Sequence, residues 1–223
     1  MLKNLRVVIT GAAGSLGQAA AAKATQCGAH VIGLDIVDAT VMANTDEYRQ
    51  LDLLDRQATL DCFAAIGKIN ALLNIAGGFA MGDLAFDPSS SQWDRMFRLN
   101  VETMRNATMG AVPMLVEGGG GAIVNIGALG ALSGQAAMSA YCCAKSSVMK
   151  LTESLAEELR HKGVNVNAVL PSIIDTAQNR KDMPDADFSR WVSPAQLAEV
   201  ICFLASTSAS GIHGALIPVR GLV

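Results

Sequence analysis

Short apolar segments alternate with longer helical segments along the chain, and this alternation restricts the possible folds most. Strands are predicted at Arg6–Thr10, His30–Asp35, Asn70–Ala76, Ala122–Ile126, Val164–Leu170 and Leu216–Val219. Helices are predicted at Leu16–Cys27, Arg56–Ile66, Trp93–Glu117, Tyr141–Lys162 and Pro194–Ala205. Strands that alternate with helices form right-handed βαβ units around a parallel sheet with helices on both faces. The sequence therefore predicts an α/β fold with a doubly wound parallel sheet.

Composition and charge narrow the functional class. Of the 223 residues, 51% are hydrophobic and 4% are aromatic, which suits helices packed closely on a sheet. The formal net charge of −3 gives no electrostatic reason to bind nucleic acid or an anionic membrane. No apolar run reaches the roughly 18 residues of a membrane span, and no signal peptide is recognisable. The five cysteines form no paired framework, which predicts reduced thiols and a cytoplasmic protein.

No linker divides the sequence. The glycine run Gly118–Gly121 falls between a predicted helix and a predicted strand, so it is interpreted as a turn. Residues 1–223 are therefore predicted to form one domain. The three histidines His30, His161 and His213 are scattered, and no metal site is predicted.

A glycine-rich loop follows the first predicted strand in VVITGAAGSLGQAA, where Gly11, Gly14 and Gly17 stand three residues apart. Glycines let a pyrophosphate approach the backbone, and the helix that follows turns its first N–H groups toward the phosphate. Taken alone, the pattern would fit a plain tight turn equally well. Its place between a strand and a helix favours dinucleotide binding.

Asp35 ends the second predicted strand, where a carboxylate can accept hydrogen bonds from ribose hydroxyls and repel a 2′-phosphate. The glycine loop contains no Arg or Lys that could bind a 2′-phosphate. NAD(H) is therefore predicted as the cofactor over NADP(H). The alternative is that Asp35 is a solvated turn residue.

Tyr141 and Lys145 in SAYCCAK lie one helical turn apart and can face one ligand. A free phenol has a pKa of about 10 and is a poor acid–base catalyst at neutral pH. A nearby ammonium and the positive ring of an oxidised nicotinamide are expected to lower the phenol pKa by roughly two or three units. Cys142 and Cys143 point about 100° apart on a helix and are interpreted as packing residues.

With these features in order, the chain resembles the short-chain dehydrogenase/reductase family over nearly its whole length. The resemblance rests on the segments TGAAGSLG, NIAG, RLNVET, YCCAK, LPSIIDT and GALIPVRG. It implies a single-domain Rossmann-type fold, with Tyr141 and Lys145 as catalytic residues and Asn100 as the anchor of a proton-relay water. The implied cofactor contacts are Gly11, Gly14, Ser15, Leu16, Gly17, Asp35, Asp52, Leu53, Asn74, Ala76, Gly77, Tyr141, Lys145, Pro171, Ile174 and Thr176.

The sequence departs from the family pattern in two places. The middle glycine of the loop is Gly14, where members of this length usually place it at the position of Ser15. The catalytic serine of the family usually stands thirteen residues before the tyrosine, and Ala128 occupies that position. A methyl group cannot donate a hydrogen bond to a substrate oxygen. Ser133 is the candidate substitute in the sequence.

Both departures occur together in the dihydropteridine-reductase branch of the family, which the chain resembles further in LPSIIDTAQNRKDMPDADFSRW and IAGGFAMG. The predicted function is NAD(H)-dependent hydride transfer to or from a small carbonyl, alcohol or quinonoid substrate. Two alternatives stay open: a quinonoid dihydropteridine reductase, and a dinucleotide-binding sensor without catalysis. The resemblance also implies a homodimer or homotetramer assembled through Trp93–Glu117 and Tyr141–Lys162.

Overall fold

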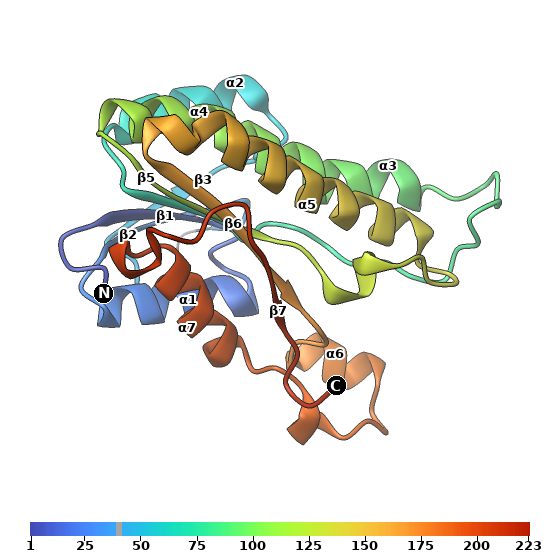
Figure 1. Ribbon diagram of the computed structural model, residues 1–223. Helices are drawn as coiled ribbons and strands as arrows, with labels where there is room; N and C mark the ends of the chain where they lie inside the picture. The colour runs from blue at the N-terminus through green and yellow to red at the C-terminus, as the bar shows by residue number, and fades with distance from the viewer. Residues whose placement is uncertain (39–41) are drawn as a thin grey trace.

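The computed structural model describes residues 1–38 and 42–223 and is drawn in Figure 1. The described residues form one seven-stranded parallel sheet in the order β3-β2-β1-β4-β5-β6-β7. The strands are β1 Arg6–Thr10, β2 His30–Asp35, β3 Glu47–Gln50, β4 Ala71–Asn74, β5 Gly121–Ile126, β6 Val164–Pro171 and β7 Leu216–Val219. The direction of winding reverses between β1 and β4, the point at which ligands bind in sheets of this kind. This confirms the predicted single α/β domain with a doubly wound, Rossmann-type sheet.

Helices cover both faces of the sheet (Figure 1). One face carries α1 Ser15–Gln26 and α7 Pro194–Leu204, and the other carries α2 Arg56–Ile66, α4 Thr103–Glu117 and α5 Ser139–Leu159. Among the described residues, no helix combines the length and the apolar character needed to span a bilayer.

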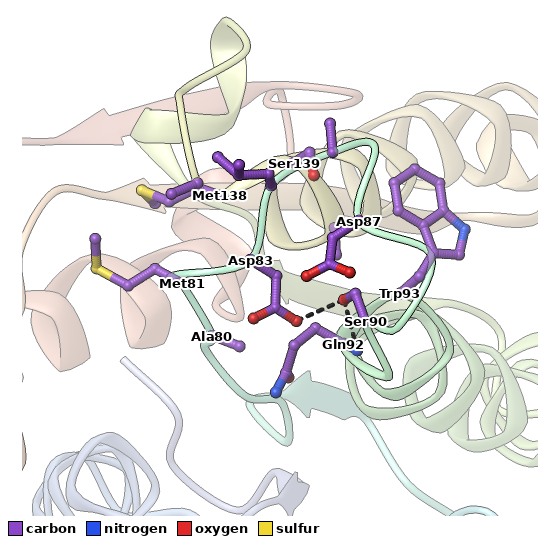
Figure 2. A pocket seen from close by; sticks show the side chains of 13 residues that line it. Ala80, Met81, Asp83, Asp87, Ser90, Gln92, Trp93, Met138 and Ser139 are labelled. Carbon is purple, nitrogen blue, oxygen red and sulfur yellow. Dashed lines mark hydrogen bonds between the residues drawn. The ribbon is translucent and has the colours of Figure 1, made fainter.

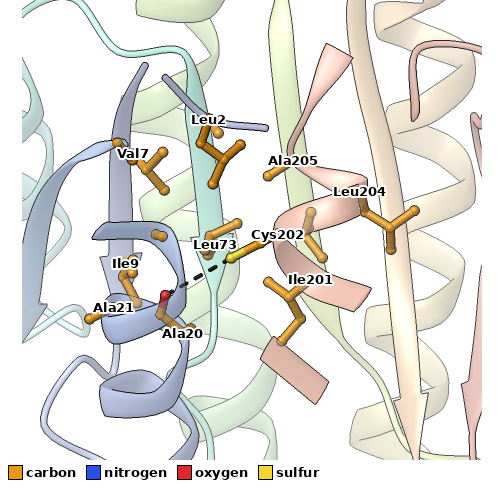
Figure 3. Packing of buried hydrophobic residues seen from close by; sticks show 14 of the residues in the cluster. Leu2, Val7, Ile9, Ala20, Ala21, Leu73, Ile201, Cys202, Leu204 and Ala205 are labelled. Atoms are coloured by element: carbon orange, nitrogen blue, oxygen red, sulfur yellow. Dashed lines mark hydrogen bonds between the residues drawn. The ribbon is translucent and has the colours of Figure 1, made fainter. Parts of the chain in front are cut away.

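The core forms one apolar layer on each face of the sheet. Val7 and Ile9 of β1 face the cluster under α1 and α7, whereas Val8 between them faces the cluster under α2 and α4. Figure 3 shows the first layer, in which Cys202 of α7 lies against Ala20 of α1. Burial raises the pKa of the Cys202 thiol to about 12, so this cysteine is a packing residue.

The predicted bounds match the structure for three strands and one helix. The segments with the predicted bounds are Arg6–Thr10, His30–Asp35, Arg56–Ile66 and Leu216–Val219. β4 is shorter than predicted and ends at Asn74, because the chain turns there into the loop that follows. The sequence missed β3, whose residues EYRQ carry no apolar run. It also missed the short helix α6 Ala177–Asp182.

The predicted single helix Trp93–Glu117 is wrong as one regular α-helix. The chain forms α3 Gln92–Phe97, then a π-helical turn Arg98–Glu102, and then α4. A π-helical turn shifts the hydrogen bonds from the fourth to the fifth residue, and such turns are frequent at functional sites. Asn100 lies within this turn.

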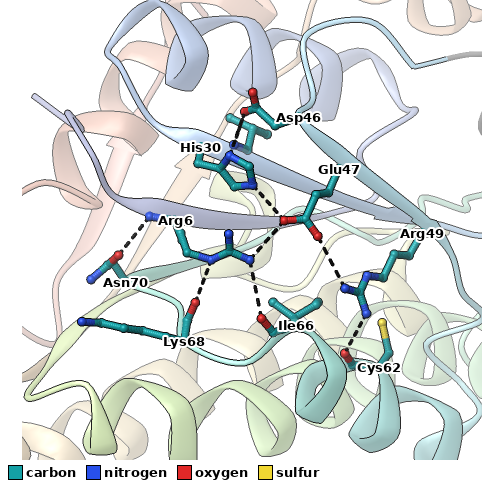
Figure 4. Close-up of polar contacts among 10 residues, drawn as sticks. Arg6, His30, Asp46, Glu47, Arg49, Cys62, Ile66, Lys68 and Asn70 are labelled. Atoms are coloured by element: carbon teal, nitrogen blue, oxygen red, sulfur yellow. Dashed lines mark hydrogen bonds and ion pairs between the residues drawn. The ribbon is translucent and has the colours of Figure 1, made fainter.

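Charged side chains join the first three strands at the amino end of the sheet (Figure 4). His30 Nε2 of β2 lies 2.8 Å from Oε1 of Glu47 in β3, and Arg6 of β1 donates to the same oxygen at 3.1 Å. Arg49 also contacts the Glu47 carboxylate. These contacts, with that of His30 first, lower the pKa of Glu47. They hold the polar edge strand β3 beside β2, at the end of the sheet remote from the switch point.

Candidate active site

The loops after β1 and β4 meet beyond the carboxyl ends of the strands. The Thr10 hydroxyl accepts hydrogen bonds from the N–H groups of Ile75 at 3.1 Å and Ala76 at 3.2 Å. Gly11 has a φ of 65°, and a Cβ there would lie 2.8 Å from the backbone of Ala76. Only a glycine satisfies both the left-handed backbone and the close approach. The glycine loop is thereby fixed at the switch point.

The next two glycines shape the start of α1. A Cβ on Gly17 would lie 2.1 Å from the carbonyl oxygen of Gly11, so the helix can pack against the loop only with a glycine there. Gly14 is the N-cap residue and provides no side-chain cap for the helix. The first N–H groups of the helix, beginning at Ser15 and Leu16, are therefore available to an anion, as a pyrophosphate requires.

Asp35 is bound to the glycine loop. Its Oδ2 accepts from the Ala13 N–H at 2.9 Å, and its Oδ1 accepts from the Ile36 N–H at 2.7 Å. Oδ1 also accepts from the Val37 N–H at 3.4 Å, so Oδ2 is the oxygen that keeps a lone pair for a further hydrogen bond. The carboxylate is therefore held beside the loop and can also accept from a ribose hydroxyl.

Asp52 and Leu53 follow β3, so the strand missed in the sequence brings them to the same edge of the sheet as Asp35. The Asp35 carbonyl accepts from the Leu51 N–H at 2.7 Å, which joins the two strand ends. Asp52 Oδ1 accepts from the Leu54 N–H at 2.9 Å, and the Leu53 carbonyl accepts from Asn106 Nδ2 at 2.8 Å. The described contacts thus fix the backbone of these two predicted cofactor contacts.

Tyr141 lies in the first turn of α5 and packs against an aromatic ring from the loop after β4. The rings of Tyr141 and Phe79 are edge to face, with centroids 4.9 Å apart. Burial raises the pKa of Tyr141 to about 12. The apolar side chains around the phenol cause this rise, and the lowering predicted from Lys145 together with an oxidised nicotinamide stays a prediction.

Lys145 directs its ammonium to the end of β5. Its Nζ donates to the Ile126 carbonyl at 2.8 Å, and burial lowers the Lys145 pKa to about 8. A Cβ on Gly77 would lie 3.4 Å from this ammonium and 2.7 Å from Asn100 Oδ1. The structure therefore brings Gly77, Asn100 and Lys145 together, and it permits only a glycine between the two side chains.

The Asn100 side chain holds the backbone that precedes Phe79. Its Oδ1 accepts from the Gly78 N–H at 3.1 Å, and its Nδ2 donates to the Gly78 carbonyl at 3.0 Å and to the Met96 carbonyl at 3.0 Å. The amide thus positions the loop that carries the ring packed on Tyr141. Its predicted role in holding a relay water stays a prediction.

Asn74 points into the protein interior. Its Nδ2 donates to Asn125 Oδ1 at 2.9 Å and to Thr108 Oγ1 at 3.2 Å, and Asn125 in turn donates to Thr152 at 2.9 Å. This buried chain ties β4 and β5 to the helices above them. In the described structure, therefore, the part of NIAG that lies nearest the glycine loop is the backbone at Ile75 and Ala76.

Ala128 lies in an apolar surface beside Tyr141. It is 4% exposed and packs in a cluster with Cys142, Met149 and Leu170. Ser133 is exposed after the 3₁₀ turn Leu129–Leu132, and no hydrogen bond to it is found in the described part of the chain. Cys142 is buried in the cluster and Cys143 is exposed, as their spacing predicts.

The segment after β6 folds back over the same edge of the sheet. β6 ends at Pro171, and Ile174 then pairs with Val192 in an isolated parallel bridge. Thr176 is the N-cap of α6, and its Oγ1 accepts from the Asn179 N–H at 3.1 Å. The Asn179 side chain donates to the Ile174 carbonyl at 2.8 Å. Ile174 and Thr176, both predicted to contact cofactor, are thus joined through one residue.

A cavity of about 200 Å³ lies between the loop after β4 and the start of α5 (Figure 2). Met81, Trp93 and Met138 supply apolar walls, and the carboxylates of Asp83 and Asp87 also line it. Asp83 Oδ2 accepts from the Ser90 hydroxyl at 2.5 Å. Ser139 and Ala140, the two residues before Tyr141 in the chain, close one side of the cavity.

Comparison with known proteins decides the family. The family model described as short chain dehydrogenase matches residues 5–187. The chain belongs to the short-chain dehydrogenase family. Members of this family are NAD(P)-dependent oxidoreductases, and this short-chain dehydrogenase accordingly uses an NAD(P) dinucleotide and acts on a small alcohol or carbonyl compound.

Several characterised proteins resemble this short-chain dehydrogenase over almost their whole length. D-xylose 1-dehydrogenase of Caulobacter vibrioides is 31% identical, with 94% of this chain and 91% of that protein aligned. 2-Dehydro-3-deoxy-D-gluconate 5-dehydrogenase of Escherichia coli is 30% identical over 99% of this chain and 95% of its own length. The ligand-free aldohexose dehydrogenase of Thermoplasma acidophilum superposes with a TM-score of 0.89 at 28% identity, covering 99% of this chain and 94% of that one. These likenesses support the family, and the dihydropteridine-reductase branch stays a prediction.

Sequence reasoning missed two residues of this short-chain dehydrogenase that the structure brings to the site. Phe79 lies in IAGGFAMG, and the sequence indicates no role for it because its contact with Tyr141 joins distant parts of the chain. Asn179 stands three residues after Thr176, the spacing of a helix cap, and that pattern could have revealed its bond to Thr176.

Proposed function

We propose that this protein is an NAD(H)-dependent oxidoreductase in which Tyr141 exchanges a proton with a small carbonyl, alcohol or quinonoid substrate. Residues 1–223 would form one nucleotide-binding domain in the cytoplasm, where the five free thiols would stay reduced. The observation that supports the proposal is that Asn100 Oδ1 and Lys145 Nζ lie on either side of Gly77, in the loop whose Phe79 ring packs against Tyr141.

Within this proposal the chain's own residues bind and orient the reactants. The dinucleotide supplies or accepts the hydride. Gly11, Gly14 and Gly17 admit its pyrophosphate to the start of α1, where Ser15 and Leu16 present backbone N–H groups. Asp52 and Leu53 would flank the adenine, and Ala76, Gly77 and Pro171 would line the cofactor path.

The proton step would fall to Tyr141. A pKa of about 12 keeps the phenol protonated at neutral pH, so it begins as a proton donor and suits reduction of the substrate. Lys145 would bind the nicotinamide ribose and stabilise the phenolate left after proton transfer. Asn100 fixes the loop that encloses the phenol.

The preference for NAD(H) is carried by Asp35. Its carboxylate is held beside the loop by the Ala13 N–H at 2.9 Å, so a 2′-phosphate would meet a fixed negative charge. Asp35→Ala should weaken NADH binding about tenfold, the factor given by about 1.4 kcal/mol, and leave NADPH binding equal or stronger. Dissociation constants measured by calorimetry for both cofactors test this, and an equal loss for the two would remove Asp35 as the selecting residue.

The surface around the phenol favours a flat, conjugated substrate as the specific candidate. Ala128 contributes a buried methyl where a hydroxyl would assist a sugar carbonyl, and Phe79 presents a half-exposed ring beside Tyr141. A quinonoid ring can be reduced with one proton donor and binds well to an apolar wall. A quinonoid dihydropteridine reductase is therefore the second candidate function, alongside the sugar oxidation named for the relatives.

A substrate screen tests the function and its alternatives together. NADH oxidation is followed by absorbance with a quinonoid dihydropterin, simple quinones and simple carbonyls, and D-xylose is assayed with NAD. Turnover should be fastest with a conjugated ring, and Tyr141→Phe should abolish it while NADH binding is retained. Turnover of D-xylose alone would overturn the conjugated-ring preference. NADH binding without turnover of any compound would instead support the dinucleotide sensor.

We also propose that two copies of the chain associate through α4 and α5. The outer face of these helices carries a hollow of about 510 Å³ lined by Met109, Val112, Leu151 and Leu155. These half-buried apolar side chains lie in one stripe, which a second copy of the same face would cover in an isologous contact.

A further inference from the structure

The segment after β6 folds back so that Val192, near its end, pairs with Ile174, near its beginning, through two hydrogen bonds. The Val192 N–H donates to the Ile173 carbonyl at 3.0 Å, and the Asp175 N–H donates to the Val192 carbonyl at 2.8 Å. In such a parallel bridge the N–H and C=O groups of the central residue, Ile174, point away from its partner. Both groups are therefore directed to the side opposite Val192.

Asn179 engages this side of the segment. Its Nδ2 donates to the Ile174 carbonyl at 2.8 Å, and its backbone N–H donates to Thr176 Oγ1 at 3.1 Å. Across the described residues, no hydrogen bond involves the Ile174 N–H. Three groups can still form a hydrogen bond with a ligand. They are the Ile174 N–H, the Thr176 O–H and the second lone pair of the Ile174 carbonyl.

These groups complement a primary carboxamide, whose oxygen accepts hydrogen bonds and whose NH₂ donates them. Under the proposed function, on which this inference rests, nicotinamide carries that group. We propose that Asn179 is a positioning residue that fixes the Ile174 peptide so that it binds the carboxamide in one orientation. The carboxamide orientation decides which face of the nicotinamide ring meets the substrate.

The side chain of Asn179 is not needed to fold α6. The cap bond to Thr176 comes from the backbone N–H of residue 179 and survives a change of side chain. Arg180 holds the segment independently, because its guanidinium binds Asp175 at 2.5 and 2.7 Å and lies 4.9 Å over the Phe188 ring. Substitution at position 179 thus tests the bond to Ile174 and leaves the helix supported.

The decisive variant is Asn179→Asp, which keeps the size of the side chain and replaces its donor with an acceptor. Calorimetry gives the dissociation constants for NADH and for ADP-ribose, which lacks the nicotinamide. Asn179→Asp should weaken NADH binding about tenfold and leave ADP-ribose binding unchanged, because Ile174 and Thr176 would contact only the nicotinamide end. The control Gln178→Ala removes a neighbouring side chain of α6, which binds Asp182 at 2.8 Å, and should change neither constant.

A second readout reports ring orientation directly. Each protein oxidises NADH that carries deuterium at one C4 position, with the best substrate of the screen as the hydride acceptor. The deuterium left in NAD is measured by mass spectrometry. Wild type should transfer from one face, and Asn179→Asp should transfer a measurable fraction from the other. A lower melting temperature with an unchanged ratio of NADH to ADP-ribose affinity would mean a structural role and would overturn the proposal.

The same experiment separates this proposal from the proposed function. If wild type binds NADH no more tightly than ADP-ribose and turns over no substrate, the proposed function fails and this inference fails with it. If wild type binds and oxidises NADH but Asn179→Asp matches it in affinity ratio and in deuterium transfer, the positioning role alone is overturned.

Discussion

Lys145 places an ammonium group inside the protein. The residue is 6% exposed, and its Nζ binds one backbone carbonyl, that of Ile126, at 2.8 Å. Burial disfavours the charged form and lowers the Lys145 pKa to about 8. Folding therefore opposes the charge on this side chain at neutral pH, and the opposition should appear in the dependence of stability on pH.

Stability should rise with pH above about 8. Native Lys145 releases its proton near that pH, while the unfolded chain holds it to about pH 10.4, so the unfolded state binds more protons in between. The free energy of unfolding should then increase between pH 7 and pH 9.5 by about 2 kcal/mol more in wild type than in Lys145→Met. Urea denaturation of both proteins measures this, and equal slopes would contradict a buried ammonium.

At the scale of elements, α4 approaches α2 so closely that their contact requires a glycine. A Cβ on Gly110 would lie 2.6 Å from the ring of Phe63. Phe63 is fully buried between α2 and the sheet, so its ring cannot move aside. The glycine is kept although it costs a helix about 1 kcal/mol relative to alanine.

Gly110→Ala should therefore destabilise the protein despite improving helix propensity. Overpacking costs about 1–3 kcal/mol, which leaves a net loss of about 1 kcal/mol in the free energy of unfolding. Gly134→Ala is the control, because a Cβ there meets no atom within 4 Å. Denaturation curves measure both variants. A Gly110→Ala protein more stable than wild type would show that the helices can separate without cost.

The elements that the sequence could predict are those whose own residues indicate how they are buried. β1 and β2 are buried on both faces, so RVVIT and HVIGLD are themselves the signal. β3 is an edge strand with a polar sequence, and its place comes from pairing with β2 and from the bonds of Glu47. The π-helical turn at Arg98–Glu102 is a shift in backbone hydrogen bonding, which side-chain periodicity does not encode.

In the candidate site, too, some features follow from the local sequence and others depend on tertiary contacts. Spacing and motif order predict that Tyr141, Lys145 and Asn100 belong together, and the structure places Gly77 between Lys145 and Asn100. The direction of the Tyr141 pKa could not be predicted, because it depends on Phe79 and the apolar clusters that fold around the phenol. Asn179 likewise gains its place from a loop closed by tertiary contacts.

At the scale of the whole molecule, the two ends of the sheet carry different kinds of residues. The amino end carries the ion pairs of Arg6, His30 and Glu47, and the carboxyl end carries the glycine loop and the tyrosine. The outer face of α4 and α5 is a third region, whose apolar hollow is proposed as the contact between two copies.

Met109→Glu combined with Leu151→Glu should convert the assembled protein to a monomer. Two carboxylates in each copy would lose water in the contact, and this cost would outweigh the apolar gain. Light scattering should show the particle mass fall to that of one chain. Lys150→Glu adds a carboxylate at an exposed position beside the hollow and should leave the mass unchanged. A monomeric wild type at micromolar concentration would contradict the contact.

The strand order also governs when the site can form during synthesis. β1 is made before its neighbours, yet it lies between β2 and β4, so one of its edges stays unpaired until Ala71–Asn74 has been translated. Gly11 reaches its place only against the backbone of Ala76, which comes later still. A nascent chain released before that point would expose a bare apolar strand edge, prone to aggregate, and would have no pyrophosphate cradle.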